Sequence, residues 1–346
     1  MDKKKIIVIG GGFTSTIFNM LIPNTKTLST NFYGNKEEYR KNLTVRKFLN
    51  INYKSYGNLF FKLKKATLHD LPVLGGNSNI WGGFINLSEI PSSLISLLNK
   101  NSIKTIKLSY ENTGSVSNKD IYQLRDINNN IFNSKSFKIP LDLCYVKKIK
   151  IVDNNIKIFT MENNIYYADT LYLATGVVQT LDLLLRSGYL ENESTISLDE
   201  YAYRSAIKFT FKRNKFDKKN SEDTIIRFNL LVAIKHLLGI QKNIKITRIF
   251  NWFPIYVDQI FFKRKNKLTL KLNDRTFSEE FSSINFGESV HYCNLKINNI
   301  PINIYLKKIH KEIYGSGMAF ISQKTPGPIS NDIILDVFQR ILSRHE

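Results

Sequence analysis

The chain begins with an apolar run that is followed at once by glycines. Ile6 to Ile9 are β-branched residues, which favour a buried strand. Gly10 to Gly12 then interrupt the pattern, and "FTSTIFNMLI" after them has the apolar spacing of a short helix. Pro23 ends this helix, because a proline has no amide hydrogen for the next helical bond. The pattern predicts a strand, a glycine turn and a helix within the first 22 residues.

Between residues 140 and 176, apolar and polar residues alternate in short runs. The runs "CYVKKIKIV", "IKIFTM" and "IYYADTLYLATG" are separated by the turn sequences "DNN" and "ENN". This pattern predicts an antiparallel meander that leads into a strand buried on both faces. A helix, "TLDLLLRSG", should follow, with Thr180 as its N-cap, Asp182 in its first turn and Gly188 at its end.

The remaining pattern divides the chain into two expected domains. Basic and aromatic residues alternate through residues 200–290, which predicts an antiparallel sheet, and "SNDIILDVFQRILSRH" has the spacing of a helix. We therefore expect an α/β fold in which residues 1–194 and 296–346 form a discontinuous nucleotide-binding domain. The antiparallel sheet of residues 195–295 would be inserted into it as a substrate or cap domain.

Composition and charge narrow the class of protein. The 346 residues are 42% hydrophobic, which suffices for a sizeable core, and no apolar run reaches the roughly 18 residues of a membrane span. The formal net charge of +21 would suit an anionic substrate or a membrane surface, but lysines spread along the whole chain favour a compositional origin. No nucleic-acid-binding motif is present, so a nucleic-acid partner is not expected. Cys144 and Cys293 form no CxxC pair, which fits a reducing, cytoplasmic compartment.

The first glycine turn has the spacing of a dinucleotide site. Gly10 and Gly12 occupy the first two glycine positions of GxGxxG, and the small residue Ser15 stands at the third. The first glycine permits a tight turn, and the second lets backbone amides at the helix N-terminus approach a pyrophosphate. Phe13 and Thr14 complete the candidate contacts of this turn. A glycine-rich turn without a ligand is the alternative.

Two further segments carry candidate cofactor contacts. "LGGNSNIWGG" is so rich in glycine that a flat ring would fit on its backbone, with polar side chains at the edge of the ring. In "LATGVV", Thr175 and Gly176 would let the chain pass close to a cofactor, while the meander would bring Val146 toward its adenine. A surface loop and a buried strand with a left-handed turn are the respective alternatives. The candidates in the first segment are Gly75, Gly76, Asn77, Ser78, Asn79, Trp81 and Gly82.

Together, these segments resemble a known family. "LGGNSNIWGG" resembles the GGxS…WGG loop of the glucose–methanol–choline (GMC) flavin oxidoreductases, and "LYLATGVVQTLDLLLRSG" resembles their adenine-side signature. "GESVHYCNLKI" and "IYGSGMAF" resemble their C-terminal catalytic segment and closing strand. The resemblance covers under half of the chain. It implies a Rossmann-like domain that binds FAD, with Gly315 and Ser316 among the cofactor contacts.

The resemblance also implies the chemistry. A flavin accepts a hydride, so the protein must take the proton of a substrate hydroxyl, a task that suits histidine. His291 matches the catalytic histidine of the family, and Asn331 is the candidate for a second catalytic position. A hydrogen-bonded strand histidine is the alternative for His291. His69 with Asp70 is a second candidate pair, whereas His310 is expected to be exposed.

The chain also departs from the family. No acidic residue follows the second expected strand, where Ser29 or Asn31 would have to bind the ribose. Tyr314 stands where an acid usually precedes Gly315. The histidines and cysteines lack the spacing of a metal site, so no metal is expected.

These observations lead to one expectation and one alternative. The expectation is an FAD-dependent oxidoreductase that oxidises an alcohol group of a small polar substrate, such as a sugar, a glycoside or an anionic compound, to a carbonyl. The alternative is a degenerate member of the fold that binds a ligand or a partner without redox chemistry. Peripheral contact with a membrane remains open because of the positive charge.

Overall fold

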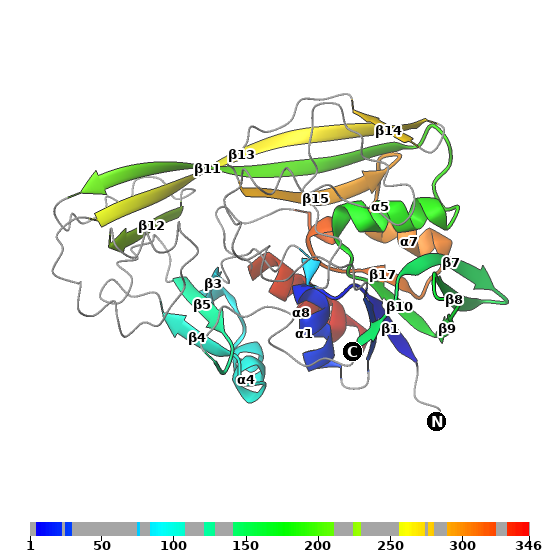
Figure 1. The fold of residues 1–346 in the computed structure, drawn as a ribbon, viewed down its shortest axis with the longest axis horizontal. Helices are drawn as coiled ribbons and strands as arrows, with labels where there is room; N and C mark the ends of the chain where they lie inside the picture. The colour runs from blue at the N-terminus through cyan, green and yellow to red at the C-terminus, as the bar shows by residue number, and fades with distance from the viewer. Residues whose placement is uncertain are drawn as a thin grey trace.

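The computed structural model places a parallel sheet with its helices beside a long antiparallel sheet (Figure 1). It describes residues 5–22, 25–29, 75–76, 84–107, 121–128, 141–210, 224–229, 256–273, 276–279, 289–322 and 331–345. The long strands β11 (Thr195–Thr210) and β13 (Tyr256–Asn273) run along the top of the view in Figure 1. The parallel sheet lies below one end of these strands.

The parallel sheet has the strand order of a dinucleotide-binding fold. Its strands are β1 (Ile6–Ile9), β2 (Lys26–Ser29), β6 (Leu141–Leu143), β10 (Thr170–Leu173) and β17 (Ile313–Gly315). In space the order is β17-β10-β1-β2-β6, and all neighbours pair in parallel. This is the doubly wound Rossmann order, in which a ligand binds at the carboxyl ends of the strands where the order reverses. The predicted α/β fold with a parallel sheet is confirmed, and the reversal lies between β1 and β10.

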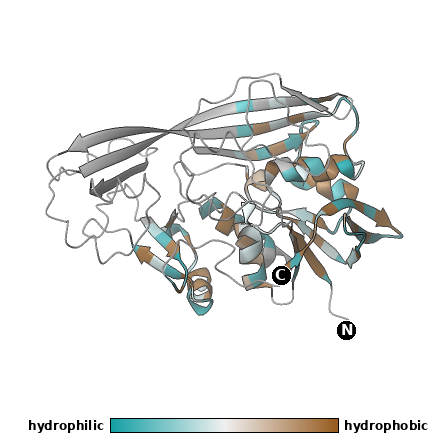
Figure 2. Ribbon diagram, in the orientation of Figure 1, coloured by the Kyte–Doolittle hydropathy of each residue, from teal (hydrophilic) through white to brown (hydrophobic). Residues whose placement is uncertain are grey.

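Helices cover both faces of this sheet: α1 (Phe13–Leu21), α5 (Gly176–Arg186), α7 (Ile302–Ile309) and α8 (Asn331–His345). Ile7 and Ile9 of β1 point into the core that α5 and α7 cover, whereas Val8 points into the core beneath α1 and α8. Alternate side chains of a strand point to opposite faces, so a strand that is apolar throughout is buried on both sides. The hydrophobic colour of β1 in Figure 2 shows this pattern.

An antiparallel meander connects β6 to β10, as the sequence predicts. Its strands are β7 (Val146–Val152), β8 (Asn155–Thr160) and β9 (Ile165–Ala168). Ile149, Ile156 and Ile158 face the core that α5 covers, and each is at most 1% exposed. The meander therefore belongs to the α5 side of the parallel sheet.

The helix after β10 begins a full turn earlier than predicted. Its N-cap residue is Thr175 and not Thr180. Thr180 lies inside the helix, where its hydroxyl donates to the carbonyl of Gly176 one turn back. Asp182 is therefore in the middle of the helix and pairs with Arg186 at 2.8 Å. The early start escapes the sequence pattern because a glycine and two valines, which are poor helix formers, open the helix.

The antiparallel sheet has the order β12-β13-β11-β15-β16, with β14 paired to β13. Its further strands are β12 (Thr224–Asn229), β14 (Thr276–Glu279), β15 (Ser289–Ile297) and β16 (Ile300–Pro301). The expected domain boundary at residues 295 and 296 falls inside β15. Ile196, Leu198 and Leu295 share the core that α5 covers, so this end of the sheet packs with the parallel sheet's helices. The division into two domains stays a prediction.

A small antiparallel sheet extends the other core. It consists of β3 (Phe84–Asn86), β4 (Lys104–Lys107) and β5 (Ile121–Arg125), accompanied by α4 (Ser92–Lys100) and the short 3-10 helix η2 (Leu87–Glu89). Ile85, Leu94 and Leu124 are fully buried in the core beneath α1. Among the helices that the structure describes, none is both long and apolar enough to cross a membrane.

Candidate functional site

Turns lie side by side at the carboxyl ends of three parallel strands. Past each strand end, one backbone amide of the turn still donates to the neighbouring strand. These bonds are Gly10 N to Leu28 O (2.8 Å), Ala174 N to Ile9 O (2.8 Å) and Ser316 N to Leu173 O (2.9 Å). The parallel ladder thus continues beyond β1, β10 and β17, and it brings together the turns of residues 10–12, 174–176 and 315–317.

Gly10 is the point where the first two turns touch. Its φ is +122°, a region that favours glycine. A Cβ added to Gly10 would also lie only 2.4 Å from the carbonyl oxygen of Ala174. The conformation and the close approach both require glycine here, so the turn after β1 can sit directly against the turn after β10.

The N-terminus of α1 lies next to this contact. Gly12 is the N-cap residue and contributes no side-chain hydrogen bond to the first amides of the helix. The first turn carries no acidic residue, and the hydroxyls of Ser15 and Thr16 donate to the carbonyl of Gly12 at 3.1 and 3.2 Å. Ser15 is fully buried, which fits close packing of α1 at the third position of the motif. A helix N-terminus of this kind carries a partial positive charge that favours an anion.

The glycine-rich loop reaches the same helix end. A Cβ added to Gly12 would lie 3.6 Å from the carbonyl oxygen of Gly75. Gly75 and Gly76 have φ values of +94° and +49°, so this part of the loop adopts a left-handed backbone. The other candidates of the loop lie outside the described residues: Asn77, Ser78, Asn79, Trp81 and Gly82.

The closing turn after β17 contacts α1 from another side. Gly317, with a φ of +96°, lies so close to Thr14 that an added Cβ would be 2.7 Å from the threonine hydroxyl. Gly315 is packed against the ring of Phe320, where an added Cβ would lie 1.8 Å from the ring. The predicted Gly315 and Ser316 are therefore brought to the N-terminal turn of α1.

Asp336 of α8 holds this closing turn, although the sequence analysis did not identify it. Its Oδ2 accepts hydrogen bonds from the Ser316 hydroxyl at 2.9 Å and from Gly317 N at 3.1 Å. Its Oδ1 accepts from Nε of Arg340 at 2.8 Å. The carboxylate is nearly buried, with 10% of the side chain exposed. The only sequence signal was the acid–arginine spacing in "DVFQR", which is common on helix surfaces.

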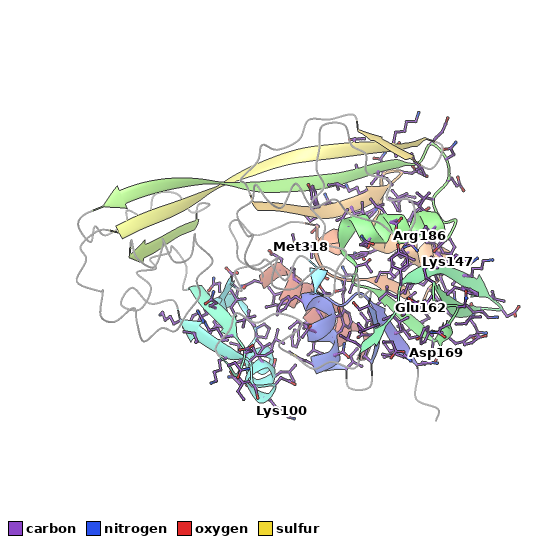
Figure 3. The ribbon with its side chains drawn as sticks, in the orientation of Figure 1. Lys100, Lys147, Glu162, Asp169, Arg186 and Met318 are labelled. Atoms are coloured by element: carbon purple, nitrogen blue, oxygen red, sulfur yellow. The ribbon has the colours of Figure 1, made fainter. Side chains whose placement is uncertain are left out.

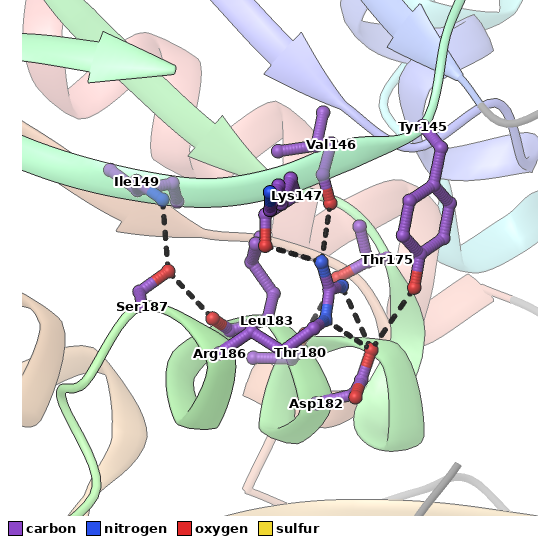
Figure 4. A network of polar contacts seen from close by, with 10 residues as sticks. All are labelled: Tyr145, Val146, Lys147, Ile149, Thr175, Thr180, Asp182, Leu183, Arg186 and Ser187. Atoms are coloured by element: carbon purple, nitrogen blue, oxygen red, sulfur yellow. Dashed lines mark hydrogen bonds and ion pairs between the residues drawn. The ribbon is translucent and has the colours of Figure 1, made fainter. Parts of the chain in front are cut away.

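Val146 and Gly176, the residues predicted to lie near an adenine, are held by different means. The Val146 carbonyl accepts from Nη1 of Arg186 at 2.7 Å, as Figure 4 shows. Gly176 has a φ of +74°, and no described atom lies within 4 Å of a Cβ added to it. The hydroxyls of Thr175 and Thr180 are 2.8 Å apart. The backbone at Gly176 is therefore open, while Val146 is fixed to α5.

An ion pair in α5 carries this fixation (Figure 4). Arg186 pairs with Asp182 and also donates to the carbonyls of Val146 and Lys147 at the start of β7. The Tyr145 hydroxyl lies 3.4 Å from Oδ2 of Asp182, and the guanidinium lies 4.8 Å from the centre of the tyrosine ring. Burial raises the pKa of Tyr145 to about 12, so the hydroxyl is protonated at neutral pH and can donate. The network fixes the meander to the helix that follows β10.

The pKa of Asp182 is set by two opposing effects. Burial, the larger effect, raises the pKa of this carboxyl above its usual range, and the neighbouring Arg186 lowers it. The Asp182 side chain is only 6% exposed, against 19% for Arg186. The guanidinium of Arg186 therefore stabilises the charged form of the buried Asp182 carboxylate.

The end of β2 contains no acidic residue, as the sequence shows. Ser29 is 3% exposed, and its carbonyl accepts from Cys144 N at 2.9 Å. Asn31, the other proposed ribose contact, lies outside the described residues. Among the described residues, Ser29 is therefore the polar residue at the end of β2.

The backbone of His291 lies in β15, opposite Tyr201 of β11. Its side chain is outside the described part of the structure. Asn294, further along the same strand, donates from its backbone amide to the carbonyl of Ile321 at 2.7 Å. The strand that carries His291 therefore runs beside the segment that follows the closing turn.

Asn331 forms a clamp on a neighbouring strand. Its Oδ1 accepts from the Asn86 amide at 2.9 Å, and its Nδ2 donates to the Asn86 carbonyl at 2.8 Å. Nδ2 also donates to the Glu89 carboxylate at 2.9 Å. The side chain is 1% exposed. These bonds use both amide hydrogens and join α8 to β3, which favours a structural role over the predicted catalytic one.

His310 was predicted to be exposed, and this is wrong. It is 8% exposed, because at the C-cap of α7 its ring bonds to Asn154 and to the amide of Glu312 instead of facing water. Nδ1 accepts from Glu312 N at 3.2 Å, which leaves Nε2 to donate to Oδ1 of Asn154 at 3.0 Å in the neutral ring. His69 and Asp70 lie outside the described residues. Within the described part of the chain, no group of histidine, cysteine and acidic side chains could hold a metal ion.

Comparisons with known proteins show only distant similarity. No protein-family model matches the chain, and no curated protein matches it significantly. Among solved structures, the tetracycline destructase Tet(51) is similar over 97% of this chain and 80% of its own, with 10% identity and a TM-score of 0.40. The RAB GDI from Plasmodium falciparum is similar over 98% of this chain and 98% of its own, with 8% identity and a TM-score of 0.40. A flavoprotein/dehydrogenase from Cytophaga hutchinsonii is similar over 98% of this chain and 76% of its own, with 8% identity and a TM-score of 0.32.

TM-scores this low carry no argument about this chain, so its class rests on its own topology. The chain is a mixed α/β protein with a doubly wound parallel sheet. The turns at the reversal of strand order are built largely of glycine.

Proposed function

We propose that this chain binds FAD at the reversal of strand order and is an oxidoreductase of the GMC type. The observation that carries the proposal is the meeting of glycine-bearing turns from four parts of the chain, at residues 10–12, 75–76, 174–176 and 315–317, around the start of α1. Glycine has no side chain that would keep a pyrophosphate away, so the backbone amides of such turns can approach it closely. The substrate would be a small polar alcohol, such as a sugar or glycoside, oxidised to a carbonyl.

The described residues fit a dinucleotide in their main features. The amides of Phe13, Thr14 and Ser15 at the start of α1 would hold the pyrophosphate, because this helix end is positive and has no acid in its first turn. Gly176 would let the cofactor approach the backbone after β10, where no described atom fills the space of a Cβ. Val146 would lie near the adenine at the start of the meander.

A bound flavin would supply the hydride acceptor for the substrate carbon. The protein would supply the base: a ring nitrogen of His291 would take the proton of the substrate hydroxyl as the carbonyl forms. The position of β15 supports this role, because Asn294 of the same strand is bonded to Ile321 just beyond the closing turn.

A second candidate is a ligand-binding protein of the same fold without redox chemistry. Two observations favour it. The strand end at β2 offers Ser29 where an acid usually binds the ribose, and Asn331 is engaged with Asn86 and Glu89. The visible absorbance of the purified protein separates the two candidates. Flavin bands that bleach when a sugar is added anaerobically support the oxidoreductase, whereas bound flavin that no sugar or glycoside reduces supports the second candidate.

The role of His291 is tested by His291→Ala, with His310→Ala as the control. Loss of a positioned base should slow flavin reduction by the active sugar by roughly 10² to 10⁴-fold while flavin content is unchanged. His310→Ala should lower the melting temperature, because it removes a buried ring together with its hydrogen bonds to Asn154 and to the amide of Glu312, and should leave the rate per bound flavin unchanged. Equal reduction rates in His291→Ala and the wild type would remove His291 from the mechanism.

A further inference from the structure

The outer face of the meander has a composition unlike its inner face. Strand pairing places its outward side chains in two rows across the sheet. One row is Lys148, Phe159 and Ile165, and the other is Lys150, Lys157 and Tyr167. We call these six residues the outer rows. The inner rows are Ile149, Ile158 and Tyr166, and Ile151, Ile156 and Ala168; Ile151 and Tyr166 are partly buried and the others are buried.

The outer rows combine positive charge with exposed apolar surface. Ile165 and Tyr167 are each 49% exposed, and Met161 in the turn between β8 and β9 is 45% exposed. Lys150 is exposed, and Lys148 and Lys157 are partly so. Figure 2 shows the resulting alternation of hydrophilic and hydrophobic residues along these strands. Apolar side chains on an exposed face cost free energy in water, so their gathering among lysines points to a partner.

The charged side chains of the outer rows are all positive. The rows contain three lysines and no acid. Glu162, near the turn after β8, directs its carboxylate to the amide of Tyr145 at 3.1 Å, and Asp169 accepts from the amide of Lys5 at 2.6 Å. Figure 3 shows Glu162 and Asp169 at this end of the molecule, together with the exposed Lys147. The face is therefore positive, in keeping with a chain of net charge +21.

We propose that the outer rows bind the protein to the surface of an anionic lipid bilayer. Lysines near such a surface are attracted to the headgroups, while their stems and the apolar residues between them enter the boundary with the acyl chains. Ile165 and Met161 are aliphatic and suit this boundary, and tyrosine is favoured at membrane interfaces.

Single-stranded RNA is the less suitable partner. Binding of that kind stacks bases on free aromatic faces. Here Lys148 Nζ lies 5.4 Å from the centre of the Phe159 ring, and Lys157 Nζ lies 5.5 Å from that of Tyr167. The ammonium groups therefore already lie over the rings that bases would need, and the other exposed apolar residues are aliphatic.

Vesicle co-sedimentation tests the proposal on the full chain. The wild type should bind phosphatidylcholine vesicles that contain phosphatidylserine and should not bind pure phosphatidylcholine vesicles. The triple variant Lys148→Gln, Lys150→Gln, Lys157→Gln should bind the anionic vesicles roughly 10- to 100-fold more weakly, because each lysine at the surface contributes to the attraction. Its melting temperature should match the wild type, since none of the three side chains is buried.

A matched control removes the same charge elsewhere. Lys100 of α4 and Lys104 and Lys107 of β4 are exposed, and Figure 3 shows Lys100 at α4, well away from the meander. Changing these three to glutamine should weaken vesicle binding by no more than about twofold, because distant charges are screened by salt. The variant Ile165→Ser, Tyr167→Ser should also bind anionic vesicles more weakly than the wild type.

The outcomes that overturn the proposal are clear. Equal binding to both kinds of vesicle, no binding to either, or an equal loss in the two lysine triples would each contradict it. Binding of a single-stranded RNA oligonucleotide that the Lys148, Lys150 and Lys157 changes abolish, without vesicle binding, would assign the face to nucleic acid instead.

Discussion

The two strand–turn–helix units at the centre of the sheet are held in different ways. In the unit β1–α1 the contacts are between backbones: a Cβ on Gly10 would lie 2.4 Å from the Ala174 carbonyl oxygen. In the unit β10–α5 no described atom lies within 4 Å of a Cβ on Gly176. Side chains hold this second helix, through Arg186 and Asp182.

The difference shows that similar geometry can have two physical sources. A crowded glycine cannot be replaced without moving the neighbouring backbone, whereas an open glycine is needed only for its dihedral angle. We therefore expect the stability of the unit β1–α1 to be most sensitive to substitution of Gly10. The stability of the unit β10–α5 should be most sensitive to loss of the Asp182–Arg186 ion pair. Because no described atom fills the space of a Cβ at Gly176, a ligand would also have room to approach the backbone there.

The largest effect should come from Gly10→Ala. The new Cβ would meet the Ala174 carbonyl, and the φ of +122° would strain any residue with a side chain. Overpacking and backbone strain together should lower the free energy of unfolding by about 3–5 kcal/mol. Urea denaturation measures this loss. A variant as stable as the wild type would show that the turn after β1 is not held by backbone contact.

A loss of about 3 kcal/mol should follow from Arg186→Ala. The change leaves the buried Asp182 carboxylate without its cation and removes the bonds to the start of β7. The double variant Asp182→Ala, Arg186→Met is the control, and it should be more stable than the single variant because no unpaired charge remains. If the double variant were the less stable, the ion pair would not be what holds α5.

Arg186→Ala should also change how the free energy of unfolding depends on pH. In the wild type, burial already raises the pKa of Asp182, and the arginine opposes this effect. Without the arginine the folded-state pKa rises further above the unfolded value. A raised folded pKa contributes stability that is present below the unfolded pKa and is lost as pH rises through the folded pKa. The stability deficit of Arg186→Ala should therefore be smaller near the ordinary Asp pKa of about 3.9 than at neutral pH. A deficit that is the same at both pH values would contradict this.

The smallest change in stability should come from Gly176→Ala, and Gly188→Ala is its matched control. The two glycines have φ values of +74° and +78°, and neither has a described atom within 4 Å of an added Cβ. Each substitution should cost about 1–2 kcal/mol for the left-handed backbone. Only Gly176→Ala should also weaken FAD binding, because Gly188 lies beyond the other end of α5. Equal FAD affinity in the two variants would exclude Gly176 from the cofactor site.

The sequence was most informative where local pattern and fold agree. The β-branched run at Ile6 to Ile9, the glycines after it and the alternation in the meander predicted their elements correctly. The start of α5 was missed because Thr180 has the chemistry of a cap but lies inside a helix opened by Gly176. Local preference is a weak guide where tertiary packing decides.

The residues that join distant segments were not predictable in the same way. Asp336 reaches the closing turn from α8, and Asn331 clamps Asn86 across 245 positions of the chain. A polar side chain on a helix carries no mark of its partner in a single sequence. The tertiary fold selects that partner, because a buried carboxylate or amide must have its hydrogen bonds satisfied.

The central claim, a pyrophosphate at the start of α1, is tested most directly by titrating FAD into the wild type and into Gly12→Asp. The fold should tolerate this change: Gly12 is the N-cap with φ −89° and ψ −170°, and aspartate is a favoured N-cap residue. An added Cβ would make only ordinary contact with the Gly75 carbonyl oxygen, at 3.6 Å. The neutral variant Gly12→Asn controls for size.

We expect the wild type to bind FAD and Gly12→Asp to lose it while its melting temperature is kept, because a carboxylate would repel the phosphates at the positive helix end. Gly12→Asn should retain more affinity than Gly12→Asp. The claim would be contradicted by a wild type that does not bind FAD, or by equal FAD affinity in the wild type and Gly12→Asp.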